Sequence, residues 1–555
     1  MTQAEWRRLW MKRGGSQPAA GPGEESPSLA VRGTIAPLVT VEGTRMNQVR
    51  GFGLVVDLVD TGGRDGPEIV RNFLVKEMRR QQEIGGPGLP PLDVLNSRDS
   101  TMVELTGFVP AGARKGDRFD VYVRAMGSEA KSLVGGRLVL GDLRRYAETP
   151  SGVLSGKTVA IASGPLFVSP FDRHGRPTDH VDLRRGVVLG GGLVRKPRKI
   201  RLVLTDPSPS VAKKIERQLN DRYAGESPIA LGESASLVEL ITPPDYRDRR
   251  AYFLNRVLHT PLDANRQGIQ ARIRGLIREF KGPEPDYNSI ALALEAVGKI
   301  ALPEIQRLYG DASRDVRFFA ARTGLRLADR DGLEIVAREA LDPKSPFRMQ
   351  AIYELGWALR MYASGEYLRK LLDDPDNTVR IAAYKALRSR PHPAIESKVL
   401  DKDNLILDSV DSGGAFLVYI HRARVPRIAL FGRQMRCRPP AMFPGERDDG
   451  RRLVTQLSAD VGDDCLTFKF RNKRNGRVSP DLKAPFGVAE LIAFLGDAPR
   501  QIDGEQRVGF AVPYSEIVDI LSTFCESGTI PAKLVLEGLE DRDAESSNER
   551  EESEF

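Results

Sequence analysis

The chain of 555 residues holds little cysteine, tryptophan or histidine, with three, three and five of them respectively. Its cysteines, Cys437, Cys465 and Cys525, are too few and too scattered for a disulfide-stapled scaffold or a zinc module. At most one pair of them could form a disulfide. Long apolar runs are also missing, because none approaches the roughly 18 residues that a membrane-spanning helix needs. These absences exclude an integral membrane protein of the helical kind.

Hydrophobic residues make up 41% of the chain and charged residues 28%, which is typical of a globular protein with a sizeable core and excludes collagen-like or wholly disordered chains. At about 150 residues per domain, the length predicts roughly three or four domains. The formal net charge is +8. Residues 540–555 hold eight acidic residues against two arginines, a net charge of −6, so the remaining chain carries +14. A basic body attracts nucleic acid, an anionic surface or an acidic partner protein, and charge alone does not choose among them.

The first part of the chain predicts a disordered lead-in followed by an α+β region. Residues 1–30 are rich in glycine, proline, serine and glutamate and lack periodicity, and no apolar stretch of a secretory signal follows their basic start. Residues 31–260 alternate short strand-like runs with Gly-rich turns. Helices are expected to begin at Pro67 and at Pro209, the latter with Ser208 as its N-cap. Strands and helices in this irregular order favour an α+β fold over a regular βαβ array.

After a predicted linker at 261–286, residues 287–400 predict an inserted array of stacked helix pairs. A motif with an aspartate, an arginine and small alanines recurs with spacings of 31 and 32 residues. A period in that range is typical of helix pairs that bury their apolar faces only by stacking. The pattern resembles HEAT-type repeats, with 289–309 as an atypical first member. The recurring charges predict a ladder of ion pairs between neighbouring repeats, formed by Asp311, Arg317, Asp342, Arg348, Asp376 and Arg380.

Residues 401–537 predict a second α+β region, and residues 538–555 predict an acidic disordered tail. Strand patterns return in this region, and a helix over 515–527 is expected to end at Gly528, a natural C-terminal stop. The predicted fold class is therefore α+β: a β-rich N-terminal region, an inserted all-α array and a C-terminal α+β domain.

Two Gly-containing patterns invite a nucleotide-binding interpretation. Gly156-Lys157-Thr158 lacks the first glycine of a phosphate loop and precedes a strand pattern, where that loop needs a helix. Gly51-Phe52-Gly53 stands before a strand and lacks the third glycine of a dinucleotide fingerprint. Neither pattern predicts a nucleotide or cofactor site.

Two further patterns contain residue types that are used in catalysis or metal binding. Asp411-Ser412-Gly413-Gly414 is similar to the nucleophile segment of chymotrypsin-like proteases, but no histidine stands in a matching motif, and a hairpin turn explains it. Four potential metal ligands share one loop, for which a polar hairpin tip is the simpler interpretation: Asp172, His174, Asp179 and His180. The sequence therefore predicts no enzyme, no cofactor and no metal site.

A basic run between residues 184 and 201 is the best candidate for nucleic-acid binding in the chain. It comprises Arg184, Arg185, Arg195, Lys196, Arg198, Lys199 and Arg201. Aromatic residues for base stacking are missing between its ends. The alternation of charged and apolar residues over 199–204 favours a strand with one polar face, solvated or facing another subunit.

Two extended glycine-containing blocks stand in the first 140 residues. The first block, 45–60, reads RMNQVRGFGLVVDLVD and is followed by Thr61-Gly62-Gly63. It resembles the opening motif of the bacterial flagellar P-ring protein family, and the matching residues include Arg45, Asn47, Gln48, Gly51, Gly53, Thr61 and Gly62. Gly51 and Gly53 let the chain enter a tightly packed strand, and the Thr-Gly-Gly segment is expected to form the turn out of it.

The second block, 103–138, is similar to a strand, a turn and a following segment of the same family. Its matching residues are Arg114, Gly116, Asp120, Gly127, Ala130, Ser132, Leu133, Gly135 and Gly136. The resemblance continues more loosely over 200–223 and 514–535. Together it covers 31–260 well and 479–537 weakly, with the helical repeats as an insertion between these parts.

The resemblance implies a non-catalytic structural subunit that assembles with copies of itself into a ring around the flagellar rod. Such a ring is a periplasmic bushing of the basal body, needed for motility, and its partners are the rod and the outer-membrane ring proteins. It implies no nucleic-acid partner and no membrane span, and the helical repeats have an unknown protein partner. The alternative is a non-catalytic interaction scaffold that works through the repeats outside a flagellar ring.

Overall fold

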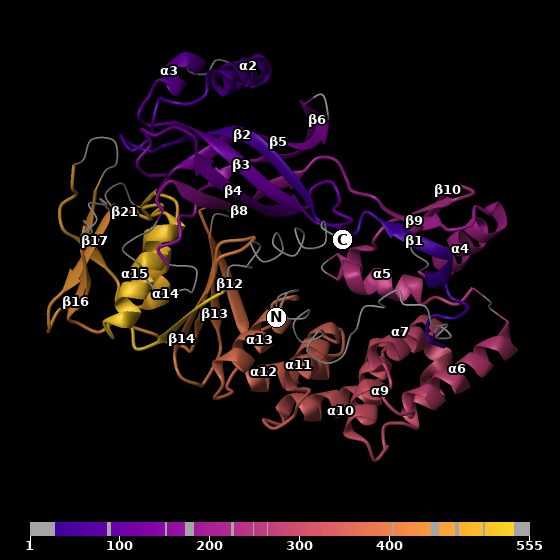
Figure 1. Ribbon diagram of the computed structural model, residues 1–555. Coiled ribbons are helices and arrows are strands. Elements are labelled where there is room, and N and C mark those ends of the chain that lie inside the picture. The colour runs from indigo at the N-terminus through magenta and orange to yellow at the C-terminus, as the bar shows by residue number, and fades with distance from the viewer. Residues whose placement is uncertain are drawn as a thin grey trace. The chain divides into compact units, whose positions relative to one another are not determined.

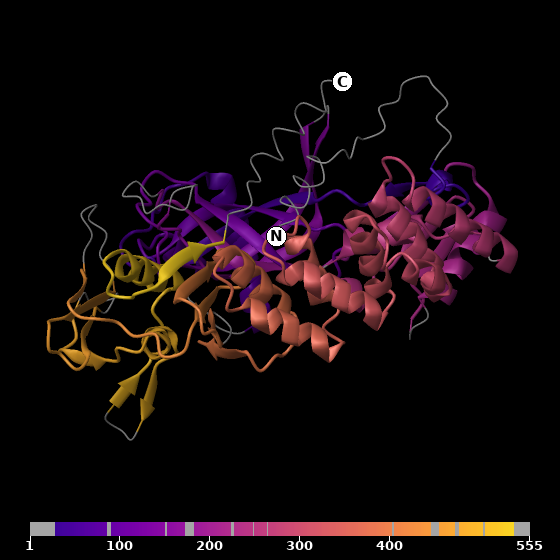
Figure 2. The same cartoon turned by 90° about the horizontal axis from the view of Figure 1, so that it is seen from below.

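The computed structural model describes residues 28–537 apart from ten segments, which are 86–89, 150–151, 172–181, 224–226, 248, 263–264, 402–404, 446–453, 472–476 and 503–505. Over its described residues the chain forms two compact units, each discontinuous in sequence. One comprises Met1–Arg45 and Arg198–Pro393, and the other Met46–Pro197 and Ala394–Phe555. A β-rich N-terminal part, a run of helices over 266–387 and a mixed β part follow one another (Figures 1 and 2), which confirms the predicted α+β class.

Six antiparallel strands of the second unit close into a barrel. Strand β2 (Asn47–Val56) pairs with β3 along one edge and with β5 along the other, so the ends of the sheet meet. The order around the barrel is β2, β3 (Thr101–Val109), β4 (Arg118–Ala125), β8 (Arg185–Val194), β6 (Gly152–Ala162) and β5 (Arg137–Thr149), with β7 (Gly164–Pro165) added to β5. Closure gives each of these six strands a paired neighbour on both sides, with β6 and β8 paired over Ala160–Ala162.

The interior of the barrel is one apolar core to which all six strands contribute. Alternation of side chains places Val103, Leu105 and Val109 of β3 on the buried face. The close approach of β2 to β5 requires Gly51, because a side chain there would overlap with the carbonyl oxygen of Asp142. The sequence therefore encodes both the core and the closing contact.

Helices α2 (Glu68–Gly85) and α3 (Pro91–Leu95) pack beside β2 and β3 through Leu54, Leu74 and Met102. The C-terminal part of the same unit has a mixed sheet in the order β12 (Ile395–Leu400), β13 (Leu405–Val410), β15 (Arg427–Phe431), β14 (Leu417–His421) and β22 (Lys533–Leu536). A second, antiparallel sheet follows the order β16 (Ala441–Phe443), β17 (Thr455–Ala459), β18 (Leu466–Phe470) and β19 (Leu482–Ala484). Both sheets share one core with helices α14 (Val488–Gly496) and α15 (Tyr514–Glu526), and a hairpin of β20 (Arg500–Ile502) and β21 (Gln506–Val508) connects these helices.

The first unit begins with a four-stranded antiparallel sheet. Its order is β1 (Val39–Glu42), β9 (Ile200–Leu204), β11 (Leu237–Leu240) and β10 (Ala230–Ser234). Helices α4 (Pro209–Arg222) and α5 (Arg250–Leu258) share its apolar core. The hydroxyl of Ser208 accepts a hydrogen bond from the Val211 amide, so the predicted N-cap of α4 is confirmed.

The run of helices completes the first unit. It consists of α6 (Arg266–Phe280), α7 (Tyr287–Val297), α8 (Leu302–Gln306), α9 (Arg314–Arg326), α10 (Arg330–Leu341), α11 (Arg348–Trp357), α12 (Tyr362–Leu371) and α13 (Asn377–Leu387). Helix α9 contacts α7 and α10, and α11 contacts α10, α12 and α13. Aromatic rings stack from repeat to repeat, with ring centroids 4.7 Å apart for Tyr287 and Phe319 and 4.3 Å apart for Phe318 and Phe347.

The helices occupy a different span from the predicted 287–400. Helix α6 lies inside the predicted linker 261–286, where Asn265 caps it and Ile273, Leu276 and Phe280 form its buried face. The last residues of the predicted array form strand β12 instead, because Pro391 and Pro393 do not continue a helix after α13.

A buried charge cluster ties the sheet part of this unit to the helices. The guanidinium of Arg326 (α9) lies 3.3 Å from a carboxylate oxygen of Glu295 (α7) and 2.5 Å from one of Glu354 (α11). The guanidinium also lies over the rings of Tyr252 (α5) and Trp357 (α11), 4.7 and 5.2 Å from their centroids. Burial lowers the pKa of Arg326, but the charges of Glu354 and Glu295 outweigh it and hold that pKa well above its ordinary value.

We expect Arg326→Met to lower the free energy of unfolding by about 3–5 kcal/mol, because it leaves two fully buried carboxylates without their cation. Urea unfolding of the whole chain measures this loss. Replacing the exposed Arg330 by Met is the matched control and should change little. Adding Glu295→Gln and Glu354→Gln to Arg326→Met should restore part of the stability, and no restoration would contradict the assigned cause.

Candidate assembly site

The two sequence blocks that resemble the P-ring family meet in space beside the barrel. The hydroxyl of Thr61 donates to the carbonyl oxygens of Leu58 and Ser132, at 2.6 and 2.9 Å. The carbonyl oxygen of Thr61 accepts from the amides of Lys131 and Ser132, at 2.8 and 3.2 Å. Residues about 70 positions apart in the chain are therefore held in one corner, which we call the motif corner and define as residues 58–65 and 127–136.

Gly62 and Gly63 bind the segment that leads into β3. The Gly62 amide donates to Arg98 O at 2.8 Å, and the Gly63 amide donates to Ser100 O at 3.1 Å. A Cβ at Gly62 would overlap with the Ser100 carbonyl and lie 2.5 Å from the Arg98 carbonyl oxygen. Only glycine fits this turn, which explains the Thr-Gly-Gly sequence.

Asp65 joins the same corner, although the sequence did not single it out. Its carboxylate accepts from the Ser128 hydroxyl at 2.8 Å, from the Glu129 amide at 3.1 Å and from the Ser128 amide. A side chain at Gly127 would overlap with this carboxylate. Burial raises the pKa of Asp65, but the hydrogen bonds from Ser128 and Glu129 outweigh it, so the pKa lies below its ordinary value.

The end of the second block turns toward β5. Ala130 and Leu133 are buried, and the Leu133 amide donates to Leu183 O at 2.8 Å. The hydroxyl of Ser132 accepts from the Val134 amide at 3.1 Å. Gly135 has φ +73°, which is favourable for glycine, and Gly136 accepts from the Leu166 amide at 2.9 Å.

Asp120, in β4 just after a tight turn, joins three segments of the chain. The Arg114 amide donates to a carboxylate oxygen of Asp117 at 2.9 Å, and Gly116 adopts φ +92° in this turn. Asp120 is buried, and its carboxylate accepts from the amides of Gly190 and Arg424, at 2.7 and 2.8 Å. Asp120 thus ties β4 to the bulge of β8 and to the loop after β14.

The remaining motif residues belong to the start of β2. Asn47 and Gln48 pair with β3, and Gly53 faces both β3 and β5. Arg45 precedes the strand, and its carbonyl oxygen accepts from the guanidinium of Arg198 at 2.6 Å. The structure brings together the Thr61–Gly62 and 127–136 residues, whereas Arg45, Asn47 and Gln48 make separate contacts.

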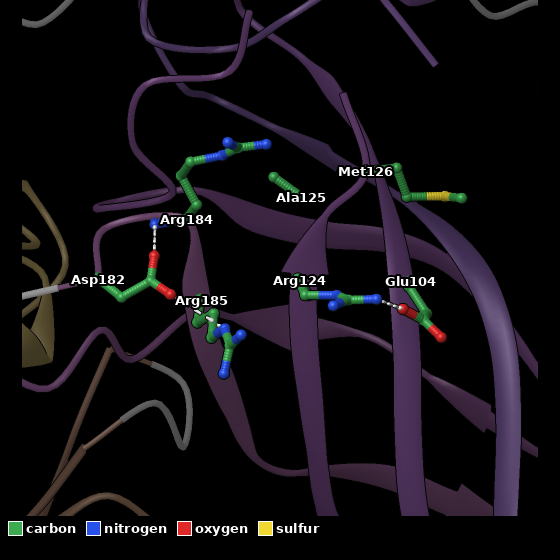
Figure 3. A pocket seen from close by; sticks show the side chains of 7 residues that line it. All are labelled: Glu104, Arg124, Ala125, Met126, Asp182, Arg184 and Arg185. Atoms are coloured by element: carbon green, nitrogen blue, oxygen red, sulfur yellow. Dashed lines mark hydrogen bonds and ion pairs between the residues drawn. The ribbon is translucent and has the colours of Figure 1, made fainter. Parts of the chain in front are cut away.

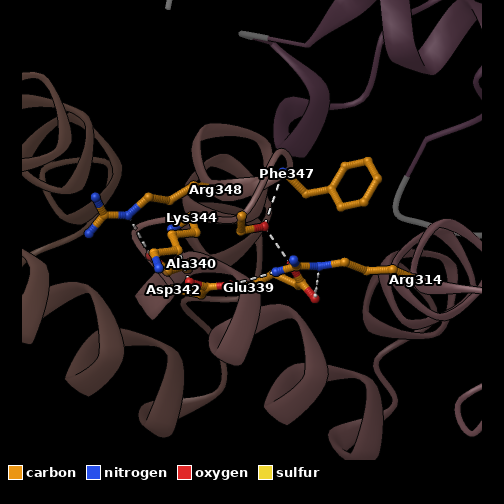
Figure 4. Close-up of polar contacts among 8 residues, drawn as sticks. Arg314, Glu339, Ala340, Asp342, Lys344, Phe347 and Arg348 are labelled. Atoms are coloured by element: carbon orange, nitrogen blue, oxygen red, sulfur yellow. Dashed lines mark hydrogen bonds and ion pairs between the residues drawn. The ribbon is translucent and has the colours of Figure 1, made fainter.

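Ion pairs link successive helix pairs, with partners that differ in part from the predicted ladder (Figure 4). The Arg314 guanidinium lies 2.7 Å from Glu339 and 2.6 Å from Asp342. Arg348 pairs with Asp374, and Lys281 lies 2.8 Å from Asp311. Arg314 and Arg348, the first residues of α9 and α11, thus pair with carboxylates at or just after the end of the following helix, α10 or α12. Asp311, Asp342 and Arg348 are among the predicted members of the ladder.

The other predicted members satisfy backbone groups near themselves. Arg317 donates to the carbonyl oxygens of Asp311 and Ala312, and Arg380 donates to that of Leu372 at 3.0 Å. The carboxylate of Asp376 caps α13 by accepting from the Thr378 amide at 2.8 Å. These residues shape the loops between helices, a role that repeat spacing alone does not distinguish from ion pairing.

The patterns set aside in the sequence occupy ordinary structural positions. Residues 156–158 lie inside strand β6, and residues 51–53 lie inside β2. Asp411 follows β13 and lies 2.8 Å from Arg433. The loop with Asp172, His174, Asp179 and His180 lies outside the described residues. Among the described residues, no group of three or more His, Cys, Asp or Glu side chains could hold a metal ion, and no helix is long and apolar enough to span a membrane.

The basic run 184–201 is partly paired within the chain, and part of it lines an open pocket on the barrel (Figure 3). Arg185 lies 2.9 Å from Asp182, and Arg124 lies 2.5 Å from Glu104 across the same pocket. Lys199 lies 2.6 Å from Glu239. Two of the seven cations of the run, Arg185 and Lys199, therefore have a carboxylate partner among the described residues.

We expect Gly62→Ala to lower the free energy of unfolding by about 1–3 kcal/mol, because the added methyl forces the carbonyls of Arg98 and Ser100 apart. Gly268→Ala is the control, since a Cβ there meets only Asn265, at 4.0 Å. That substitution should stabilise α6 by about 0.5–1 kcal/mol. Urea unfolding measures the free energy of unfolding of both variants. Equal changes in the two variants would contradict the steric explanation.

We expect ionised Asp65 to contribute a pH-dependent share of the free energy of unfolding. Its pKa in the folded chain lies below the ordinary value of 3.8, so this share is full above pH 3.8 and is lost as pH falls through the lower folded value. Thermal unfolding of the wild type and of Asp65→Asn between pH 7 and pH 2.5 measures it. The difference between the two should shrink with acidification, and a difference that grows would contradict the sign.

Comparison with known proteins places these features in a family context. Residues 34–273 match the family model described as "Flagellar P-ring protein". Flagellar P-ring proteins of Geobacter metallireducens and Nitratidesulfovibrio vulgaris are 29% and 32% identical over 41% of this chain and 61% and 60% of their own lengths. That of Anaeromyxobacter dehalogenans is 28% identical over 53% of this chain and 76% of its own length.

One solved structure is similar over 22% of this chain and 81% of its own, at 22% identity and a TM-score of 0.19: the complex of CpcE and CpcF of phycocyanin lyase from Nostoc sp. PCC7120. The chain spans about three fifths of the length of the P-ring relatives that it matches first. The matched region contains the barrel and the motif corner, 58–65 with 127–136. The resemblance to the flagellar P-ring protein family therefore holds over residues 34–273.

Proposed function

We propose that this chain is a non-catalytic structural subunit of the flagellar P ring. In this role copies of the chain assemble into a closed ring around the rod, in the periplasmic part of the basal body, and act as a bushing for the rotating shaft. The observation that carries the proposal is the match over 34–273, because it includes both motif blocks and the barrel that they complete. Its partners in the basal body are the rod and the outer-membrane ring proteins.

The physical properties of the barrel support a bearing role. A bearing wall must resist deformation, and a closed antiparallel barrel pairs the backbone of every strand on both sides. The motif corner fixes the turns at one place by hydrogen bonds between short, glycine-rich segments. Ring closure requires two different surfaces on each copy that fit one another head to tail, and stiff subunits keep the rotation per step constant.

A second candidate function is an interaction scaffold outside a flagellar ring. The observation that favours it is the run of helices over 266–387, nearly all of which lies beyond the matched residues. The Arg326 cluster fastens these helices to α5, so they form a rigid platform within their unit. Surfaces of stacked helices are used for binding extended protein partners.

We expect deletion of the coding sequence to abolish swimming while rod export continues, because the bushing is added around a rod that is already exported. Motility assays and immunoblots for rod protein in the medium and envelope measure both effects. Wild-type complementation is the control. A deletion strain that swims normally would contradict the ring proposal.

Electron microscopy of purified basal bodies separates the two candidate functions. The ring proposal predicts a ring with additional density from the helices over 266–387. That density should project outward, since helices in the bore would obstruct the rod. Recovery of the chain in the cytoplasmic fraction, with basal bodies unchanged in its absence, would favour the scaffold.

A further inference from the structure

The outer face of helix α6 is a row of cations. Arg266, Arg274 and Arg278 are exposed, and Lys281 follows the end of the helix. Residues three or four apart lie on one face of a helix, so Arg274, Arg278 and Lys281 form a row away from the buried Leu276 and Phe280. Arg266 is exposed at the start of the helix, seven residues before the buried Ile273. Helix α6 is the first of the run (Figure 1), and it contacts α7 and α8. We call Arg266, Arg274 and Arg278 the α6 stripe.

No carboxylate among the residues that the structure describes pairs with Arg266, Arg274 or Arg278. Lys281 is engaged with Asp311 at 2.8 Å. Glu279, the acidic residue of the helix, accepts from the Ser28 hydroxyl at 2.8 Å.

Helix stability does not explain this arrangement. Arg266 is the first helical residue, where a cation opposes the helix dipole, and the first turn contains no acidic residue. Arg274 and Arg278 repel one another because they are four residues apart. By contrast, Arg272 on the same helix donates to the carbonyl oxygens of Arg32 and Ala30, at 2.5 and 2.8 Å, and has a structural role. The stripe therefore has the properties of a surface for an external anion.

The chain itself contains a segment with the complementary chemistry. Residues 540–555 carry eight carboxylates and two arginines, a net charge of −6. Guanidinium groups bind carboxylates through two parallel hydrogen bonds. Each copy of the chain therefore carries an excess of cations on α6 and an excess of carboxylates in its sequence at 540–555.

We propose that the α6 stripe binds the acidic segment 540–555 of a second copy of the chain. The inference rests on the proposed ring, because head-to-tail closure needs two different and complementary surfaces on every copy. One stripe and one acidic segment per copy satisfy that need without further partners. Attraction between them acts over the Debye length, about 10 Å at 0.1 M salt, and steers copies into contact before the rigid surfaces fit.

Mixing two full-length variants tests the contact. The first has all eight acidic residues of 540–555 replaced by their amides, so it offers only a stripe. The second carries Arg266→Glu, Arg274→Glu and Arg278→Glu, so it offers only an acidic segment. Fluorescence anisotropy of the labelled first variant, titrated with the second, measures binding between them.

We expect the mixed variants to bind at 50 mM NaCl and to lose affinity by at least about tenfold at 500 mM, because salt screens exposed charges. Titrating the labelled variant with itself should give at least about tenfold weaker binding. The control carries Arg330→Glu, Arg338→Glu and Lys344→Glu, three exposed cations elsewhere in the helices with the same change of net charge. Used as the titrant, it should bind the first variant as the wild type does.

Three outcomes would overturn the proposal. The mixed variants fail to bind while circular dichroism shows both folded; the triple α6 variant binds its own kind as the wild type does; or cross-links between 540–555 and α6 form only within one chain. Failure of the ring proposal looks different. Salt-dependent pairing in vitro together with a deletion strain that swims would leave the contact standing and refute the ring, whereas normal rings built from the triple α6 variant would refute the contact alone.

Discussion

Strand β2 hydrogen-bonds along both of its edges, to β3 and to β5, and this double pairing turns an open sheet into a barrel. The pairing depends on an approach so close that Gly51 has no room for a side chain. Once the barrel is closed, its core is complete and each of its six strands has a paired neighbour on both sides. The motif corner and the Asp120 junction both attach to strands whose positions this closure fixes.

The helices of the other unit are organised by charge as well as by apolar packing. Arg326 sits between Glu295 and Glu354 in a buried site that joins three helices of the run to α5. Outside the core, the ion pairs of Arg314 and Arg348 join the start of one helix to the end of the helix that follows it. Buried charge as well as apolar packing therefore joins the helices to α5 within their unit.

The motif residues that resemble the P-ring family act mainly through their backbones. Gly62 is needed because two carbonyl oxygens lie where its side chain would be, and Thr61 joins segments about 70 residues apart. Such residues carry no reactive chemistry, and their contribution is the precise placement of turns. This agrees with a role in which shape and stiffness are the function.

The sequence by itself determined the α+β class, the N-cap at Ser208, the strands around Gly51 and the helical run, because periodicity, glycine and capping residues act locally. It also located the family resemblance, since the motif blocks are continuous in sequence. The tertiary structure alone decided the barrel closure, the meeting of Thr61 with Ser132 and the ladder partners of Arg314 and Arg348. Helix α6 was missed because its mixed basic and apolar sequence follows a linker-like stretch. These features depend on contacts between distant residues, and a repeat spacing gives the position of a charge but not the partner that folding brings within reach.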